Sequence, residues 1–446
     1  MLYFFCRINY GGSIMKSKIL KRTTGFMLAA VLLFSIAAPC AGAAAAESTA
    51  KTDYPYVYVH GLFGWGQDEG IDGAVPYWGA TSCDLMKELN RMGYESYAAS
   101  VGPMSSCWDR VCELYAQITG TRVDYGEAHS AAHNHSRYGR DYSEPMIEGW
   151  GEPDENGNIK KINLVGHSFG GATVRMFTYL MEYGSSEEQA ATESDDLSPL
   201  FAGGKGNWIH SVTTLCSPHN GTTLAYMFEE MDLTTLAEVF CFLYAGMMGR
   251  SELNGFVDFH LEQFGLTYIP GEGSTPEESF KEAFMLIMTQ NDKAMDDLFP
   301  EGAEKINDMI DVVDGVYYFS YAYQCTKKSS VSNNQVPTLK TLPVLIPFSM
   351  MMGAYSKNRV SDYPIDETWL ANDGMVNVVS ALHPDDEPYE SFASRPGSEC
   401  ETGVWYVMPV REGHHGTVIG LNEARRPTVD FYRSMTALID TLPATD

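Results

Sequence analysis

Positive charge is scarce in this sequence, and its scarcity limits the partners that the protein can bind. Lysine and arginine number 30 against 58 aspartates and glutamates, which gives a formal net charge of −28 at pH 7. A surface this acidic repels nucleic acids and strongly anionic membranes, whereas neutral or zwitterionic partners fit it better. No nucleic-acid partner is therefore expected.

Cysteine and long apolar runs are also scarce. Beyond residue 46 the cysteines are Cys83, Cys107, Cys112, Cys216, Cys241, Cys325 and Cys400. An odd number, thinly spread over a long chain, excludes a disulfide framework but leaves a single bridged pair open. Outside the N-terminal segment no apolar run is long enough to cross a bilayer, so stable membrane insertion is not expected.

Residues 1–46 are predicted to be a short extension followed by a secretory signal peptide. From Met15 the chain has a basic stretch, then the apolar run FMLAAVLLFSIAA, then small residues as far as Ala46. This order is typical of a cleaved signal, whereas a membrane anchor would need a longer run. Cleavage would remove five basic and no acidic residues, so the secreted chain would carry a net charge of −33.

Strand-like and helix-like segments alternate along residues 47–446, which we predict to form a single domain. Strands are expected at YPYVYVHG, YESYAASVGP, KINLVG, WIHSVTTLCSP, GVYYFSYAY and VWYVMPV, and helices at TSCDLMKELNRMGY, SSCWDRVCELYAQITG, TVRMFTYLMEYG and PTVDFYRSMTALIDTL. Such alternation favours an α/β fold, with a mostly parallel sheet and helices on both faces. Two insertions interrupt the pattern, one at about 105–160, loop-like from 119 onward, and a helical one at about 222–300.

The second insertion contains a strongly apolar helical segment. Leu233, Leu236, Phe240, Leu243 and Met247 fall on one helical face, and VFCFLYAGMM is apolar nearly all round. An ordinary buried core helix would have this pattern. A mobile lid over an acyl-binding cleft would have it too. The sequence leaves both interpretations open.

The motif G-x-S-x-G occurs at Gly166–Gly170, with Ser168 at its centre. It follows the apolar run Ile162–Val165 and precedes a helix-like stretch, and strand, sharp turn and helix are the context of a nucleophile elbow. The flanking glycines avoid clashes in the strained turn. A chance match in a glycine-rich turn is the alternative.

A serine nucleophile requires a histidine base and a carboxylate that orients the histidine. Among the later histidines, His414 and His415 follow the strand-like VWYVMPV, and loops at strand C-termini hold catalytic groups in such sheets. His260 lies within the insertion, and His383 lies in an acidic loop. Asp373, in the Asn-Asp-Gly turn of WLANDGMVN, is the best candidate acid, although an ordinary turn aspartate would look the same.

An oxyanion hole needs two backbone N–H donors. Phe169, directly after the serine, is expected to supply one. Leu62, after the strand-terminal His60-Gly61 pair, is expected to supply the other.

Several motifs resemble those of one family. They are HGLFGWG, YWGATSCDL, VDYGEAHSAAHNHSRYGR, GHSFGG, SVTTLCSPHNGTTL, WLANDGMVN and HHGTVIG. Together they are similar to the secreted zinc-containing lipases of Bacillus-type bacteria and their staphylococcal relatives, over essentially the whole chain beyond residue 46. The resemblance implies an α/β-hydrolase fold with a helical lid, Ser168 as nucleophile, Asp373 as acid and His415 as base. It also implies Leu62 and Phe169 as oxyanion donors.

The resemblance further implies a structural zinc ion bound by Asp109, His129, His135 and Asp292, with His133 as a spare histidine. The residues alone favour a solvated polar loop around these histidines. The family also has a calcium site just after the catalytic histidine, but here Thr417 and Asn422 replace its acidic ligands and Glu423 replaces a proline. Calcium requires carboxylate oxygens, so this site is expected to be weakened or absent.

These observations predict a secreted triacylglycerol lipase that acts on lipid or ester substrates at a lipid–water interface. A phospholipase A1 or a short-chain carboxylesterase could use the same residues. A non-catalytic binding protein on a hydrolase scaffold is disfavoured, because Ser168, Asp373 and His415 are all present.

Overall fold

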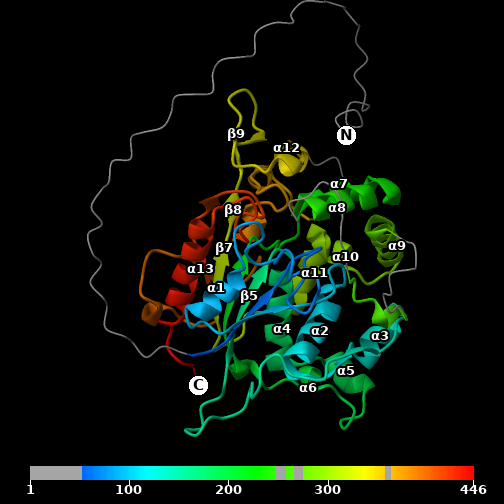
Figure 1. Cartoon of the computed structure of the whole chain (residues 1–446), viewed down its shortest axis with the longest axis vertical. Helices are drawn as coiled ribbons and strands as arrows, with labels where there is room; N and C mark the ends of the chain where they lie inside the picture. The colour runs from blue at the N-terminus through cyan, green and yellow to red at the C-terminus, as the bar shows by residue number, and fades with distance from the viewer. Residues whose placement is uncertain (1–52, 248–257, 266–274, 357–362, 446) are drawn as a thin grey trace, which may run out of the picture. The chain divides into compact units, whose positions relative to one another are not determined.

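A parallel sheet of seven strands lies at the centre of the structure (Figure 1). The computed structural model describes residues 53–247, 258–265, 275–356 and 363–445, so the predicted extension and signal peptide lie outside the described residues. Neighbouring strands follow the order β11, β12, β7, β6, β5, β1 and β2, and every neighbouring pair is parallel. Their bounds are β1 (Tyr56–Val59), β2 (Ser96–Ala99), β5 (Ile162–His167), β6 (Ile209–Leu215), β7 (Tyr317–Tyr321), β11 (Tyr389–Ser391) and β12 (Trp405–Val407).

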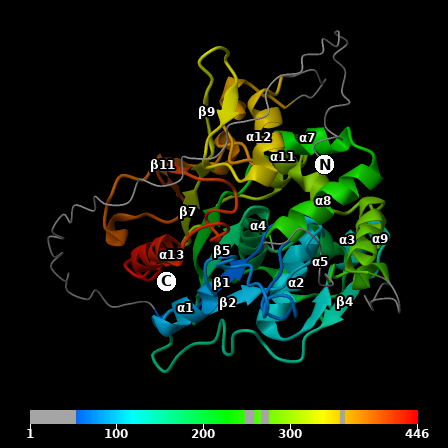
Figure 2. The same cartoon turned by 45° about the horizontal axis from the view of Figure 1, so that its top comes forward.

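The central strands are buried along their whole length because helices cover both faces of the sheet. On one face α1 (Leu85–Arg91) lies against α13 (Arg425–Ile439). On the other face α2 (Cys107–Thr119) packs against α4 (Gly170–Tyr183), as Figures 1 and 2 show. This arrangement confirms the predicted α/β architecture. No helix in the described ranges is long and apolar enough to cross a bilayer.

Helix α2 begins and ends at side-chain and glycine signals in the sequence. The Ser106 hydroxyl accepts a hydrogen bond from the Asp109 backbone N–H, which caps the N-terminus. Gly120 adopts a left-handed conformation with φ of 67° and ends the helix. A cap of this kind contributes roughly 1 kcal/mol, and here it fixes Asp109 in the first helical turn.

Residues 119–160, predicted to be loop-like, are mostly irregular but also contain short ordered elements. This region contains an antiparallel pair, β3 (Arg122–Asp124) and β4 (Tyr138–Asp141), which flanks α3 (Glu127–His133). Ser130 is the buried residue of α3, so the region has no apolar periodicity that a sequence analysis could detect. Polar contacts order it instead, among them a bidentate pair from Arg137 to Asp124.

The region 222–300 is helical, as its periodicity indicates. Its described helices are α7 (Thr223–Glu229), α8 (Leu233–Met247), α9 (Pro276–Met288) and α10 (Ala294–Leu298). Leu236 and Phe240 of the predicted apolar face are buried, and the Phe240 ring lies 4.4 Å from that of Phe63. The Leu243 and Met247 side chains lie outside the described part.

Smaller elements complete the described chain. They are α5 (Ser186–Ala191), α6 (Pro199–Ala202), α11 (Pro300–Met309), α12 (Ile346–Gly353), the pair β8 (Tyr323–Gln324) and β13 (Arg411–Glu412), and the hairpin of β9 (Thr326–Lys328) and β10 (Gln335–Pro337). The hairpin, α12, α7 and α8 lie together at one end of Figure 1, opposite α5 and α6. The seven cysteines among the described residues are free, and all except Cys83 are buried.

Candidate active site

Ser168 occupies a strained turn between β5 and α4, at the carboxyl edge of the sheet. Its φ is 55°, in the left-handed region that residues with a side chain seldom adopt. A Cβ atom at Gly166 would lie 2.4 Å from the Gly170 carbonyl oxygen, and one at Gly170 would lie 2.2 Å from that of Val59. Only glycine fits at both positions, which is the physical reason for the motif.

His415 and Asp373 contact each other through their side chains. His415 Nδ1 lies 2.8 Å from Asp373 Oδ2, and because a carboxylate only accepts hydrogen bonds, Nδ1 carries the proton. Asp373 Oδ1 accepts the backbone N–H groups of Met375 and Val376 at 2.9 and 2.8 Å. The carboxylate is therefore held from both sides, and His415 Nε2 is left as a proton acceptor.

The other candidate histidines have different surroundings. His414, which the residues alone left as an alternative, is buried, and its burial lowers the pKa to about 4. His383 stacks on the Tyr389 ring with centroids 3.6 Å apart, and His260 Nδ1 lies 3.5 Å from Glu113 Oε2. Of these four histidines, only His415 lines the cleft that contains Ser168.

One narrow apolar cleft brings Ser168, His415 and Leu62 together. Its other lining residues are Phe63, Tyr77, His167, Leu342, Val344, Leu345, Met375, Gly416, Ile419 and Leu421. The free volume is about 50 Å³, enough for only a few water molecules. Among the described contacts no hydrogen bond joins Ser168 Oγ to His415, and such catalytic bonds often tighten only when substrate is bound.

Among the described residues, the Leu62 and Phe169 backbone N–H groups have no protein acceptor, in contrast to those of Gly61, Phe63 and Ser168. Gly61 N–H donates to the Tyr77 hydroxyl, Phe63 N–H to the Pro103 carbonyl and Ser168 N–H to the Leu215 carbonyl. Within the described part of the chain, neither the Leu62 nor the Phe169 N–H donates to a protein acceptor. Two free donors beside Ser168 can stabilise an oxyanion.

A polar chain that the sequence analysis missed connects the loop of Gly61 and Leu62 with the turn of Ser168 and the His415 loop. The Tyr77 hydroxyl lies 3.0 Å from Gly61 N and 2.6 Å from His167 Nδ1. His167 Nε2 in turn lies 3.2 Å from the His415 carbonyl oxygen. Burial and the nearby His415 lower the pKa of His167, so the neutral ring accepts from Tyr77 and donates to His415. The motif YWG contains Tyr77 but gives no sign of this role.

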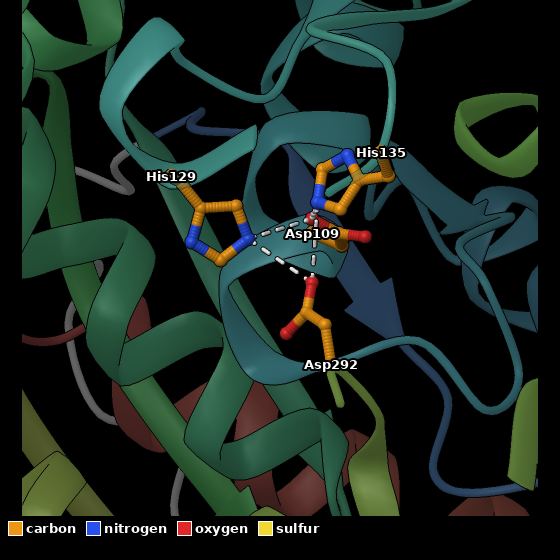
Figure 3. Close-up of side chains that lie close together, drawn as sticks. All are labelled: Asp109, His129, His135 and Asp292. Carbon is orange, nitrogen blue, oxygen red and sulfur yellow. Dashed lines mark hydrogen bonds and ion pairs between the residues drawn. The ribbon is translucent and has the colours of Figure 1, made fainter. Parts of the chain in front are cut away.

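The four predicted metal ligands converge on one point, as Figure 3 shows. His129 Nε2 lies 3.3 Å from Asp109 Oδ1 and 3.0 Å from Asp292 Oδ2, and His135 Nε2 lies 3.5 Å from Asp292 Oδ2. One ligand atom from each residue lies within 4.8 Å of all the others. Tetrahedral zinc with bonds of about 2.0–2.1 Å separates its ligand atoms by about 3.3 Å, so this spacing suits a metal ion.

Unpaired polar atoms in the group also fit a bound cation. Asp109 Oδ1 and His135 Nε2 are buried, and neither has a hydrogen-bond partner among the described residues. Burial, and then the charge of Asp292, raise the pKa of Asp109 to about 6, so a positive ion would relieve a real electrostatic cost. The spare His133 faces the other oxygen of Asp292, at 4.0 Å.

Residues around the group orient two of its members. Gln263 Nε2 donates to Asp109 Oδ2 at 2.9 Å and so leaves Oδ1 facing the centre. The Trp108 ring stacks on the His129 ring with centroids 5.1 Å apart. Supporting contacts of this kind hold metal ligands in place. Gln263 gives no signal in the sequence because it lies far from the ligands along the chain.

The residues expected to weaken a calcium site serve the His415 loop itself. Thr417 Oγ1 accepts the His414 backbone N–H at 2.9 Å, and the Asn422 backbone N–H donates to Thr81 Oγ1 at 2.8 Å. A second group with metal-ligand spacing is formed by Cys216, Asp373 and His415. Two of its members already share the hydrogen bond described above.

Fold and site together define a class, the α/β hydrolases with a serine at the nucleophile elbow. The family model described as "Lipase-like, C-terminal domain" matches residues 52–443. The chain therefore belongs to this lipase family, which confirms the resemblance seen in the motifs.

Known proteins agree with this assignment. The chain is 33% identical to Lipase 2 of Staphylococcus aureus over 394 residues, 87% of this chain and 54% of that protein. It thus spans about half the length of the curated relatives it matches. Among solved structures, EstA from Clostridium botulinum has 34% identity, a TM-score of 0.78 and coverage of 89% of both chains. Lipase 1 from Pelosinus fermentans has 35% identity and a TM-score of 0.75, over 88% of this chain and 100% of that one.

Proposed function

We propose that the protein is a secreted triacylglycerol lipase, with residues 47–446 as a single catalytic domain. The observation that carries this proposal is the apolar cleft that Ser168, His415 and Leu62 line together. Among the described residues, the N–H groups of Leu62 and of Phe169, which directly follows the serine, have no protein acceptor. The named lipases among its relatives support the same activity. Glyceride esters carry no charge, so the acidic surface of the protein does not repel them.

The proposed reaction begins when His415 Nε2 takes the proton of Ser168 Oγ, which attacks the ester carbonyl carbon. The Leu62 and Phe169 N–H groups stabilise the negative oxygen of the tetrahedral intermediate. His415 then protonates the departing alcohol, and the acyl group remains on Ser168. Water attacks the acyl-enzyme with the same base, and the fatty acid leaves.

Asp373 supports this cycle without giving up its own charge. Its hydrogen bond to His415 Nδ1 stabilises the imidazolium that forms in both steps. The adjacent His167 remains neutral because burial and the His415 charge lower its pKa. It therefore places no permanent positive charge beside the base.

We infer that α8 and its neighbours form the lid. Phe240 of α8 packs on Phe63, which lines the cleft directly after Leu62. A free volume of about 50 Å³ is too small for a long acyl chain, so the lining must move to admit one.

We further propose that Asp109, His129, His135 and Asp292 hold a structural zinc ion. When bound, the ion would supply four-coordinate cross-linking of separate segments rather than a step of the reaction. The ion would thereby link α2, α3 and the loop that follows α3 to Asp292 of the insertion. The calcium site of related lipases is proposed to be weakened or absent, because Thr417 and Asn422 lack carboxylates.

The narrow cleft also favours a second candidate, a short-chain carboxylesterase with the same catalytic residues. Hydrolysis of emulsified tributyrin and triolein, beside a soluble short-chain ester, separates the two. A lipase cleaves the long-chain emulsion, at a rate that increases once the substrate concentration exceeds its solubility limit. The Ser168→Ala variant should cleave neither the emulsion nor the soluble ester. Cleavage of the soluble ester alone would assign an esterase. Release of fatty acid from phospholipid vesicles alone would assign a phospholipase A1. Turnover by Ser168→Ala would contradict the proposed nucleophile.

A further inference from the structure

Acidic residues are absent from one long stretch of this acidic chain. Residues 315–361 contain no aspartate or glutamate, although 58 of the 446 residues are acidic. The described part of this stretch includes the β9–β10 hairpin and α12, with Lys327, Lys328 and Lys340 as its basic residues. This stretch therefore differs in charge from the remainder of the chain.

The same end exposes apolar side chains. Leu339 is 106% exposed and Met350 55%, and Ile346 and Val410 are also exposed. These four residues line one groove of about 1010 Å³ together with Lys327 and Lys340, and we call these six residues the apolar–basic groove. Arg411 and a single acid, Glu412, also border it. A contiguous exposed apolar patch with a polar rim is typical of an interaction site.

Helix α12 explains why this surface remains uncovered. Its inner side is buried, and the Phe348 ring packs on that of Phe228 in α7, with centroids 5.7 Å apart. Its outer side carries Ile346 and Met350, four residues apart and thus on one helical face. The inner side thus packs into the fold, whereas the described residues leave Ile346 and Met350 on the outer side exposed.

The groove is continuous along the chain with the cleft that contains Ser168. Leu342, Val344 and Leu345 line that cleft, between Leu339 and Ile346 of the groove. Figures 1 and 2 show the hairpin and α12 beside α7, at the end of the molecule that bears the insertion. A surface that contacts Ile346 in the groove is therefore one residue along the chain from Leu345, which lines the cleft.

We propose that the apolar–basic groove docks the protein on a lipid–water interface, an inference that rests on the proposed lipase function. Leu339, Ile346, Met350 and Val410 enter the apolar layer, and the lysines lie at the level of the headgroups. Hydrolysis leaves fatty acid carboxylates in this layer, which repel a secreted chain of net charge −33. The acid-free stretch 315–361 with its lysines tolerates that charge, so the protein keeps its cleft turned toward the substrate as product accumulates.

The docking test measures binding separately from catalysis. Flotation with triolein droplets coated with phosphatidylcholine is measured for the Ser168→Ala chain, alone and with Leu339→Asp plus Met350→Asp. Tyr183→Asp is the control, because Tyr183 is 51% exposed, close to the 55% of Met350, but lies at the end of α4 beside α6. The double variant is expected to bind the droplets about tenfold or more weakly, and the control is expected to bind unchanged.

A second pair of variants tests the basic residues. Lys327→Glu plus Lys340→Glu is expected to leave binding to uncharged droplets nearly unchanged and to weaken binding to droplets that contain oleate. The same Lys→Glu change at Lys160, a partly exposed residue outside the groove, should have no comparable effect.

Three results would overturn the proposal. The first is equal flotation of the Leu339/Met350 variant and its control. The second is equal sensitivity of the Lys327/Lys340 variant and the Lys160 variant to oleate. The third is self-association that the Leu339/Met350 variant abolishes while its flotation persists. Turnover of a soluble ester in the Ser168-containing chains is the reference. If that turnover persists, only the docking surface is wrong, whereas absence of Ser168-dependent turnover would contradict the lipase function itself.

Discussion

His415 is joined to Asp373 twice, through its side chain and through its backbone. Nδ1 lies 2.8 Å from Asp373 Oδ2, and the His415 backbone N–H donates to the Asp373 carbonyl oxygen over 2.9 Å. The two contacts fix both the position and the rotation of the imidazole. Its free Nε2 therefore lies in the cleft with Ser168 before any substrate is bound.

Replacing Asp373 by asparagine tests this relationship. An amide can donate to Nδ1, which favours the tautomer with its proton on Nε2, so the base is lost although the geometry is kept. We expect kcat for a soluble ester to fall by about 10³–10⁴-fold. Thermal unfolding should change little. Asp311→Asn, at an exposed position, is the control, and an Asp373→Asn enzyme with more than a tenth of normal activity would rule out this role.

Tyr77→Phe tests the polar chain that links the oxyanion loop to the elbow. The variant keeps the aromatic packing but removes the hydroxyl that accepts from Gly61 N–H and donates to His167. Because the adjacent Leu62 N–H then loses its fixed direction, kcat should fall about tenfold or more, with a smaller change in KM. Steady-state kinetics on one soluble ester measures this. Tyr183→Phe should be neutral, and an unchanged kcat in Tyr77→Phe would assign the tyrosine to packing alone.

Metal content and stability should depend together on the four ligands. We expect about one zinc ion per chain by elemental analysis, lost in His135→Ala and in Asp292→Asn. A ligand at a thousand times its Kd stabilises a fold by about 4 kcal/mol, so a chelator should lower the Tm measurably. His133→Ala is the matched control and should keep its metal. Full metal content in the ligand variants would refute the site.

Glu69 should make the protein less stable at alkaline pH. Its carboxyl accepts the Gly66 backbone N–H, and burial raises its pKa from 4.5 to about 8 despite the opposing charge of His260. The folded chain thus keeps a proton that the unfolded chain releases above pH 4.5. The free energy of unfolding therefore falls as pH rises through that window to about 8.

Glu69→Gln retains the acceptor oxygen and removes the titration. Denaturant unfolding at pH 5 and pH 9 should show the variant gaining stability relative to the native sequence at pH 9, by on the order of 2 kcal/mol. Identical pH dependence in the two proteins would show that Glu69 is ionised in the fold. Glu182→Gln, a carboxyl on another face, serves as control.

The sequence predicted most of what local pattern controls. The short apolar runs at Tyr56–Val59 and Ile162–Val165 predict buried strands, as observed. The G-x-S-x-G motif predicts the turn of Ser168, because a Cβ atom at Gly166 would clash in that turn. The α3 region was misread because polar contacts rather than apolar periodicity order it.

Long-range convergence could not be predicted from the residues. His414 and His415 are neighbours of one type, and only the fold decides which imidazole meets Asp373. Tyr77 and Gln263 act through contacts with residues 90 and 154 positions away, for which no spacing rule exists. The metal ligands were inferred from family resemblance, since the loop by itself favours solvation.

The most direct test of the account is covalent labelling by a fluorophosphonate probe, read out by mass spectrometry of the digested protein. One adduct is predicted, on the peptide that contains Ser168, because only a serine activated by His415 attacks the phosphorus atom rapidly. Labelling should vanish in Ser168→Ala and slow by orders of magnitude in His415→Ala, while both variants stay folded. An adduct on another residue, or labelling of Ser168 that His415→Ala leaves unchanged, would contradict it.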